Sequence, residues 1–118
     1  MNDPIHQLSQ QIKEFCDERE WDPFHGPKDL AIGAVTEASE LLEHFRFQSD
    51  EQIANLLNNE TSRKAIGEEL ADVLFFILRF AQKYEFDLYQ CFQEKMQKNA
   101  RKYPVSEFKG KNHKSTHS

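Results

Sequence analysis

Apolar residues recur every three or four positions along most of the chain, a spacing that places them on one face of a helix. Four long helices are predicted in this way, over about residues 4–20, 28–47, 61–84 and 87–103. Asp3 and Pro4 suit the start of the first helix, and Pro104 prevents the last one from continuing. No segment alternates apolar and polar residues as a half-buried strand would. The pattern therefore predicts an all-α fold, most simply a four-helix bundle.

Shorter signals lie between these helices. Ser49-x-x-Gln52 has the form of a capping box and predicts a short extra helix that ends at Asn58 and Asn59. Residues 21–27 hold two prolines and a glycine, which stop a helix, beside two aromatic residues and a histidine, so they predict an ordered loop. The polar residues 109–118 are expected to form a disordered tail after a single domain of residues 1–108.

The composition narrows the class of protein. Of the 118 residues, 38% are hydrophobic and ten are Phe, which suffices for a packed core, although so short a chain gains from association with a second copy. No stretch approaches the roughly 20 apolar residues of a membrane-spanning helix, so we expect no membrane and a cytoplasmic location. The net charge of −5 argues against nucleic acid as a partner, because that binding depends on Lys and Arg. Cys16 and Cys91 have no neighbouring cysteine and are expected to be buried thiols.

Two of the predicted helices each carry an acidic pair, Glu37-x-x-Glu40 on one and Glu69-x-x-Asp72 on the other. Residues three apart share a helix face, so each pair forces like charges together at the edge of an apolar stripe. If the stripes pack against each other, the four carboxylates can converge. Partly desolvated carboxylates raise one another's pKa, and a hard cation such as Mg²⁺, Mn²⁺ or Ca²⁺ relieves their repulsion. Because Mg²⁺ often shares its coordination with phosphates, the pattern indicates phosphoryl chemistry.

Other interpretations of the acids remain. Acidic residues three apart can simply lie on a solvated helix face, as Glu40-x-x-Glu43 illustrates. The matched placement of two pairs, with no Lys or Arg three or four residues from Glu37 or Glu40, favours a metal site. A di-iron centre in a helix bundle uses Glu-x-x-His, and no Glu in this chain has a His three residues later.

The order of these motifs resembles the MazG-like nucleotide pyrophosphohydrolases, whose metal signature is Glu-x-x-Glu, a variable spacer, then Glu-x-x-Asp. Here 28 residues separate the two pairs. Three further sequence segments resemble those of the dCTP pyrophosphatase branch of this family. They are Trp21-Asp22-x-Phe24-His25-x-Pro27-Lys28-x-Leu30, Glu68-Glu69-Leu70-Ala71-Asp72-Val73-Leu74, and Lys95-Met96-x-x-Asn99 with Lys102-Tyr103-Pro104. The resemblance covers nearly the whole chain before the tail.

This resemblance implies hydrolysis of a deoxynucleoside triphosphate to the monophosphate and pyrophosphate, with Mg²⁺ as cofactor and Mn²⁺ as the second choice, by an intertwined dimer or tetramer. It implies that the metal ligands are Glu37, Glu40, Glu69 and Asp72. A carboxylate can also act as the general base, and Glu40 is our choice. We expect dCTP as the first substrate and dATP as the next, in cleaning of the nucleotide pool. The alternatives are a non-catalytic helical module for interaction or nucleotide sensing, and a pyrophosphohydrolase of the dUTP or phosphoribosyl-ATP type.

Base recognition requires a flat stacking surface and a polar edge. The expected base-binding residues are the aromatic Trp21, Phe47 and Phe76 with the polar His25 and Asp29, and packing in the core is the alternative for each aromatic. Members of the dCTP branch tend to have Trp at the position of Phe47 and Tyr at that of Phe76, which leaves the preferred base open. The expected phosphate and sugar contacts are Lys28, Lys95, Asn99, Arg101, Lys102 and Tyr103.

Overall fold

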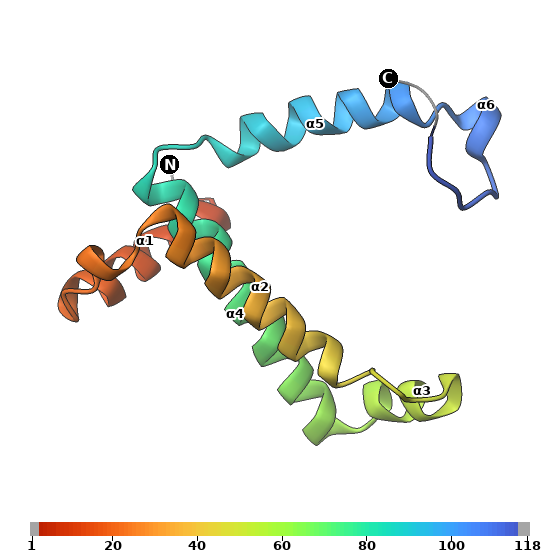
Figure 1. Ribbon diagram of the computed structural model, residues 1–118, viewed down its shortest axis with the longest axis horizontal. Coiled ribbons are helices and arrows are strands. Elements are labelled where there is room, and N and C mark those ends of the chain that lie inside the picture. Colours follow the sequence, from red (N-terminus) through yellow and green to blue (C-terminus); the bar gives the residue numbers. More distant parts are fainter. Residues whose placement is uncertain (1–2, 116–118) are drawn as a thin grey trace. The chain divides into compact units, whose positions relative to one another are not determined.

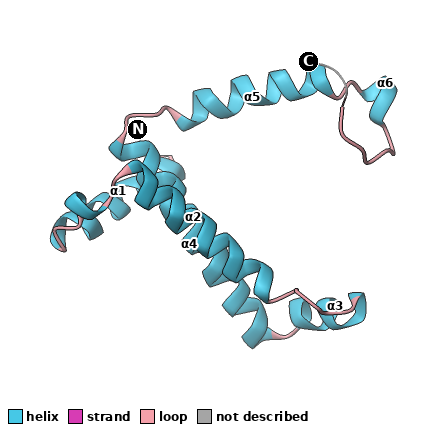
Figure 2. Cartoon of the chain, viewed as in Figure 1, coloured by secondary structure: helices cyan, strands magenta, loops and turns pink. Residues whose placement is uncertain are grey.

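Helices account for all the regular structure in the computed structural model, which describes residues 3–115 (Figure 1). Along the chain these are α1 (Pro4–Glu18), the 3₁₀ turn η1 (Asp22–Phe24), α2 (Pro27–Glu43), α3 (Asp50–Asn58), α4 (Glu60–Lys83), α5 (Leu88–Lys102) and α6 (Val105–Phe108). Figure 2 shows helices joined by loops, and no strand occurs among the described residues. The predicted all-α class is confirmed.

The helix starts follow local capping chemistry. The side chain of Asp3 accepts a hydrogen bond from the backbone N–H of His6, and Asp87 caps α5 in the same way. Ser49 and Gln52 form the reciprocal capping box that their spacing predicts at the start of α3. Each of these caps satisfies backbone donors that the first helical turn leaves unpaired.

Two helices end earlier than their apolar periodicity predicts. α1 ends at Glu18, and Glu20 has a positive φ of 53°. α2 ends at Glu43, and Phe47 has a positive φ of 63°. Left-handed backbone is incompatible with an α-helix, so the chain leaves the helix although apolar residues continue in the sequence.

The contacts of the chain divide it into two compact units, one reaching to Tyr84 and the other beginning at Glu85. The sequence pattern predicts α5 as the fourth helix of a bundle, but α5 belongs to the second unit. Its apolar side chains Tyr89, Phe92 and Met96 are exposed. Cys91, which we expected to be buried, is exposed as well.

An antiparallel pair, α2 with α4, forms the framework of the first unit, and α1 and α3 also contact α4 (Figure 1). Gly33 allows the close approach of α2 to α4. A Cβ atom at this position would lie 2.3 Å from Cε1 of Phe76. The ring of Phe76 therefore occupies the space that any other residue at position 33 would need, and the two acidic segments are held side by side.

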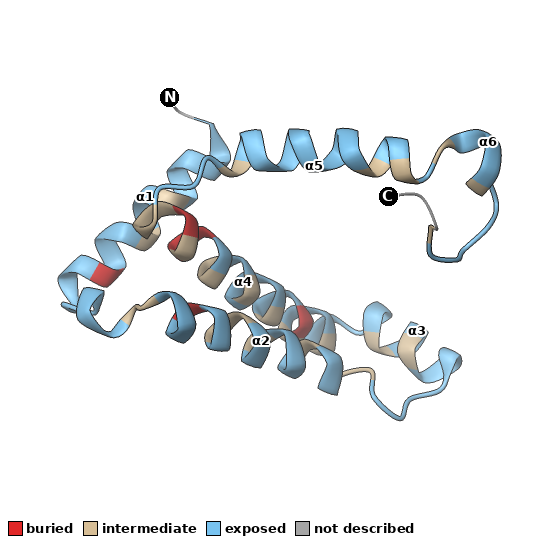
Figure 3. Cartoon of the chain, turned by 45° about the horizontal axis from the view of Figure 1, so that its top comes forward, coloured by how far each residue is buried: buried red, intermediate tan, exposed pale blue. Residues whose placement is uncertain are grey.

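The core of the first unit is small. Its buried apolar side chains come from α1, α2 and α4 (Figure 3), and they are Cys16, Leu30, Ile66, Leu78 and Ala81. The burial of Cys16 confirms the expectation for this thiol. None of the described helices combines the length and apolar character that crossing a bilayer requires.

In the second unit a short helix that we did not predict, α6, follows Pro104. The backbone N–H of Phe108 donates to the carbonyl of Pro104. The expected disordered tail is described only as far as residue 115, where Ser115 Oγ donates to the carbonyl of Lys102 and the ring of His113 lies 4.8 Å from that of Phe108. Residues 116–118 lie outside the described part, and disorder of the tail stays a prediction.

Candidate metal centre

Three acidic side chains meet between α2 and α4. Glu37 and Glu40 project from α2 and Glu69 from α4, and one carboxylate oxygen of each lies within 4.8 Å of the other two. The three-residue spacing puts the first two on one face of α2, and the close helix crossing at Gly33 brings the third beside them. Three of the four acids that the sequence analysis singled out therefore converge.

The cluster is partly removed from solvent. Glu37 and Glu69 are half-buried, whereas Glu40 is exposed. Oε2 of Glu37 and Oε2 of Glu69 are buried and have no hydrogen-bond partner within the described chain. Buried carboxylate oxygens without a partner are costly, and native proteins rarely retain them without a reason.

The electrostatics of the cluster are dominated by like charges. A hydrogen bond with Glu40 raises the pKa of Glu37 to about 7, with burial and the charges of Glu40, Asp72 and Glu69 adding to the effect. Asp72 lies outside the group of three but acts on it through its charge. Without a cation, Glu37 is therefore harder to ionise than an ordinary glutamate.

The donor set fits a hard divalent cation. It offers carboxylate oxygens only, which suit Mg²⁺, Mn²⁺ and Ca²⁺, whereas Zn²⁺ usually takes nitrogen or sulfur ligands as well. The two orphaned oxygens of Glu37 and Glu69 are the positions where such a cation would replace the missing partners.

The loop before α2 is anchored by a buried cation that the sequence analysis overlooked. Arg79 is only 3% exposed, and its guanidinium donates to Nδ1 of His25 at 2.9 Å, to Oδ1 of Asp22 at 3.0 Å and to Gln82 at 2.9 Å. Gln82 in turn donates to Ser9 on α1. An arginine among the apolar positions of α4 was the signal in the sequence, since such a residue needs buried partners.

Two polar residues that we expected at the base have structural contacts. Burial lowers the pKa of His25, and the charges of Arg79 and Lys83 lower it further, so its Nδ1 accepts the bond from Arg79. The carboxylate of Asp29 accepts a hydrogen bond from the backbone N–H of Gly26 at 3.2 Å. Both side chains thus hold the loop and the start of α2.

The three expected stacking aromatics have different surroundings. Trp21 packs edge-on against Phe15, with ring centroids 5.5 Å apart. The ring of Phe76 lies over Gly33 in the α2–α4 crossing. Phe47 is 90% exposed, with the guanidinium of Arg46 lying 4.8 Å from its ring centroid. Of the three, Phe47 has the most surface free for a ligand.

The remaining expected contacts lie at the start of α2 or in the second unit. Lys28 is exposed in the first turn of α2. The others lie on α5 or cap it, and they are Lys95, Asn99, Arg101, Lys102 and Tyr103. The ring of Tyr103 packs against Phe108, with centroids 5.0 Å apart. The role of all these residues stays a prediction.

Comparison with known proteins identifies the family. The model of the MazG-like family matches residues 32–117, a segment that includes all four acids. The chain belongs to the MazG-like family. This family assignment confirms the resemblance drawn from the acidic pairs and the blocks around them.

Relatives and a solved structure agree with this assignment. Over 92 residues the chain is 38% identical to dCTP pyrophosphatase 1 of Bos taurus and 36% identical to that of Homo sapiens. These alignments cover 78% of this chain and 54% of each relative, so the chain spans about half the length of the curated relatives it matches. The crystal structure of a pyrophosphatase from Archaeoglobus fulgidus superposes with a TM-score of 0.80 at 33% identity, covering 88% of this chain and 95% of that one.

Proposed function

We propose that this MazG-like chain hydrolyses a deoxynucleoside triphosphate to the monophosphate and pyrophosphate, with Mg²⁺ or Mn²⁺ as cofactor. The observation that carries the proposal is the acidic cluster, in which Glu37 and Glu69 each keep a buried oxygen without a partner. Glu37, Glu40 and Glu69 are the proposed metal ligands, and Asp72 completes the set. A bound divalent cation would neutralise the triphosphate and acidify a water molecule.

The residues of the chain have distinct tasks in this reaction. Glu37 and Glu69, fixed on two packed helices, would hold the cation, and the bound cation would orient the triphosphate. Glu40 is exposed and accepts the proton of the attacking water as general base. The oxygen of that water bonds to the α-phosphorus, the bond to the α–β bridging oxygen breaks, and pyrophosphate leaves.

The first substrate to test is dCTP, because the curated relatives carry the name dCTP pyrophosphatase 1. dATP comes next, because this chain has Phe47 and Phe76 where members of the dCTP branch tend to have Trp and Tyr. The polar groups of those two side chains are therefore absent, which leaves room for another base. Trp21, His25 and Asp29 are further proposed contacts of the nucleoside. The proposed contacts of the phosphates and the sugar are Lys28, Lys95, Asn99, Arg101, Lys102 and Tyr103. A role in cleaning the nucleotide pool of the cytoplasm, without nucleic acid or membrane as partner, fits this activity.

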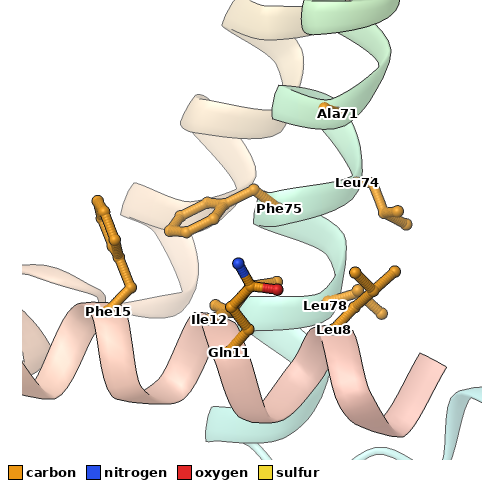
Figure 4. A pocket seen from close by; sticks show the side chains of 8 residues that line it. All are labelled: Leu8, Gln11, Ile12, Phe15, Ala71, Leu74, Phe75 and Leu78. Carbon is orange, nitrogen blue, oxygen red and sulfur yellow. The ribbon is translucent and has the colours of Figure 1, made fainter. Parts of the chain in front are cut away.

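The working form is proposed to be a dimer or tetramer. An apolar groove of about 270 Å³ opens between α1 and α4 (Figure 4), with Leu8, Phe15, Leu74 and Phe75 among its walls. In the other unit the apolar side chains of α5 are also uncovered. Copies of a short chain commonly cover such surfaces by symmetric association. A sedimentation experiment that finds only monomer at micromolar concentration would contradict this part of the proposal.

The activity is tested by measuring pyrophosphate release from a full panel of nucleoside triphosphates with Mg²⁺ or Mn²⁺. Glu69→Gln should lower kcat/KM by roughly 100-fold or more, because it removes a charged metal ligand while keeping its shape. Glu68→Gln is the matched control, since the neighbouring Glu68 is exposed and lies outside the cluster. No release from any nucleotide, and no Mg²⁺-dependent nucleotide binding by calorimetry, would instead indicate a non-catalytic module.

A further inference from the structure

The loop between α1 and α2 is tied to the last turns of α4. Nε of Arg79 donates to Nδ1 of His25 at 2.9 Å, and the hydroxyl of Tyr84 donates to the backbone carbonyl of the same histidine at 3.0 Å. Lys83 donates to the backbone carbonyl of Asp22, near the start of the loop. Both the ring and the backbone of His25 are therefore fixed from one helix.

The bond at Nδ1 determines which nitrogen of the ring carries the proton. A guanidinium keeps its protons throughout the pH range of a folded protein, so Arg79 can only donate. Nδ1 of His25 must then be the acceptor and must lack a proton. In the neutral ring the proton therefore lies on Nε2.

The same contact keeps the ring uncharged. Protonation would turn an Nδ1–H of His25 towards the Nε–H of Arg79, so that two donors would face each other. Burial lowers the pKa of His25, and the charges of Arg79 and Lys83 lower it further. The carboxylates of Asp22 and Asp29 act in the opposite direction and more weakly. At neutral pH this side chain is therefore a donor through Nε2 and not an acid or a base.

Nε2 is the part of the ring that remains open to a ligand. No group among the described residues bonds to it. Within residues 3–115 the side-chain polar atoms that are both buried and without a partner belong to Glu37 and Glu69, so Nε2 of His25 reaches solvent. The ring lies edge-on to Trp21, with the centroids 6.1 Å apart. One ring nitrogen thus holds the loop, and the other is available.

We propose that Arg79 is a positioning residue, which holds His25 so that its Nε2–H donates to an acceptor atom of the nucleoside. The proposal rests on the proposed function, in which His25 contacts the nucleoside while the acidic cluster holds the cation. Arg79 itself is only 3% exposed and acts through the histidine. A ring that is fixed beforehand loses no rotational freedom on binding, which should strengthen affinity roughly three- to tenfold.

NMR of the ring nitrogens of His25 measures the tautomer in the full chain above neutral pH, and the unaltered protein should show a single state with the proton on Nε2. Arg79→Met removes the donors and leaves an apolar side chain of similar length, which suits a buried position better than an unpaired charge. In this variant His25 should show a mixture of tautomers and a pKa closer to 6.5. A proton on Nδ1 in the unaltered protein would overturn the proposal without the need for any variant.

Kinetics with the preferred dNTP separate positioning from general support of the fold. Arg79→Met should raise KM roughly three- to tenfold and change kcat less, because the acidic cluster is intact. Arg79→Lys keeps a donor for Nδ1 and should recover most of the affinity. Gln82→Met is the matched control, since it removes another partner of Arg79 and leaves the bond to His25 in place. It should keep the original KM, whereas a merely structural network would show a raised KM in both Met variants.

A double-mutant cycle tests whether Arg79 acts through His25. His25→Ala should itself raise KM, and the addition of Arg79→Met should raise it no further. Additive effects of the two changes, or an unaltered KM in an active Arg79→Met protein, would contradict the proposal. Failure of the proposed function looks different, because the unaltered protein would then release no pyrophosphate from any dNTP even with the proton of His25 on Nε2.

Discussion

Two carboxylate oxygens, Oε2 of Glu37 and Oε2 of Glu69, are buried beside each other's charges without a hydrogen-bond donor. A residue kept for stability alone would not be placed there, since unpaired buried charge opposes folding. Strained or repulsive groups of this kind are typical of sites where a ligand completes the structure. At the residue scale, the proposed function of this cluster and the stability of the fold therefore oppose each other.

Replacing Glu37 by Gln tests that opposition. Glu37→Gln should raise the melting temperature of the metal-free protein by a few degrees, because it removes one of the mutually repelling charges. If the cluster binds Mg²⁺ as proposed, Mg²⁺ should stabilise the unaltered protein, and Glu37→Gln should lose most of this added stability. Thermal scans with EDTA and with Mg²⁺ measure both effects, and Glu68→Gln should behave as the unaltered protein. A lower melting temperature of Glu37→Gln in EDTA would contradict the repulsion argument.

His25 gives a separate prediction on pH. Its pKa lies below the usual value of 6.5, because burial and Arg79 disfavour the protonated ring. Below pH 6.5 the unfolded chain therefore binds more protons at this position than the folded chain, so the free energy of unfolding falls as the pH falls. His25→Gln keeps an acceptor for Arg79 but does not titrate, and it should flatten this acid-side loss. Denaturant titrations between pH 5 and 8 measure the slope, and His6→Gln, an exposed change on α1, should leave it unaltered.

At the scale of elements, the crossing of α2 and α4 depends on one glycine. Gly33→Ala should destabilise the fold by roughly 1–3 kcal/mol, because the new methyl group would collide with the ring of Phe76. Gly67 lies in the middle of α4 with open space around it, so Gly67→Ala should instead stabilise by about 0.5–1 kcal/mol. Chemical denaturation compares the two, and equal effects would show that the crossing tolerates a side chain.

The elements also show which features a sequence can predict. The starts of α1, α3 and α5 were predictable because Asp3, Ser49 and Asp87 act on backbone groups three residues away. The end of α2 was not, because apolar residues continue through Phe45 and Phe47 although the backbone turns there. Local chemistry fixes where a helix begins, whereas this helix ends where the chain must turn into α3.

The same distinction applies to the site. The acidic pairs could be found from their three-residue spacing, and their order along the chain matched the metal signature of the family. The position of Arg79 indicated that it needs buried partners, but the partners His25 and Asp22 could not be identified, because they are 54 and 57 residues away in the sequence.

At the scale of the whole molecule, the apolar surface exceeds what the described core uses. Few side chains are buried, while large apolar ones remain exposed in both units, among them Phe92 at 63%. Exposed apolar area of this kind is unfavourable in water and is removed when copies associate. Stability should therefore depend on protein concentration, because association of folded chains draws the equilibrium away from the unfolded state.

This dependence can be measured directly. The melting temperature should rise as the concentration is increased from the micromolar to the hundred-micromolar range, and sedimentation should show an oligomer over the same range. Phe92→Glu places a charge on the apolar side of α5, so it should shift the protein towards monomer and remove the concentration dependence. Gln93→Glu, at the exposed neighbouring position, is the matched control for the added charge. If both variants remain oligomers of unchanged stability, the copies associate without this face of α5, and the groove between α1 and α4 becomes the surface to alter next.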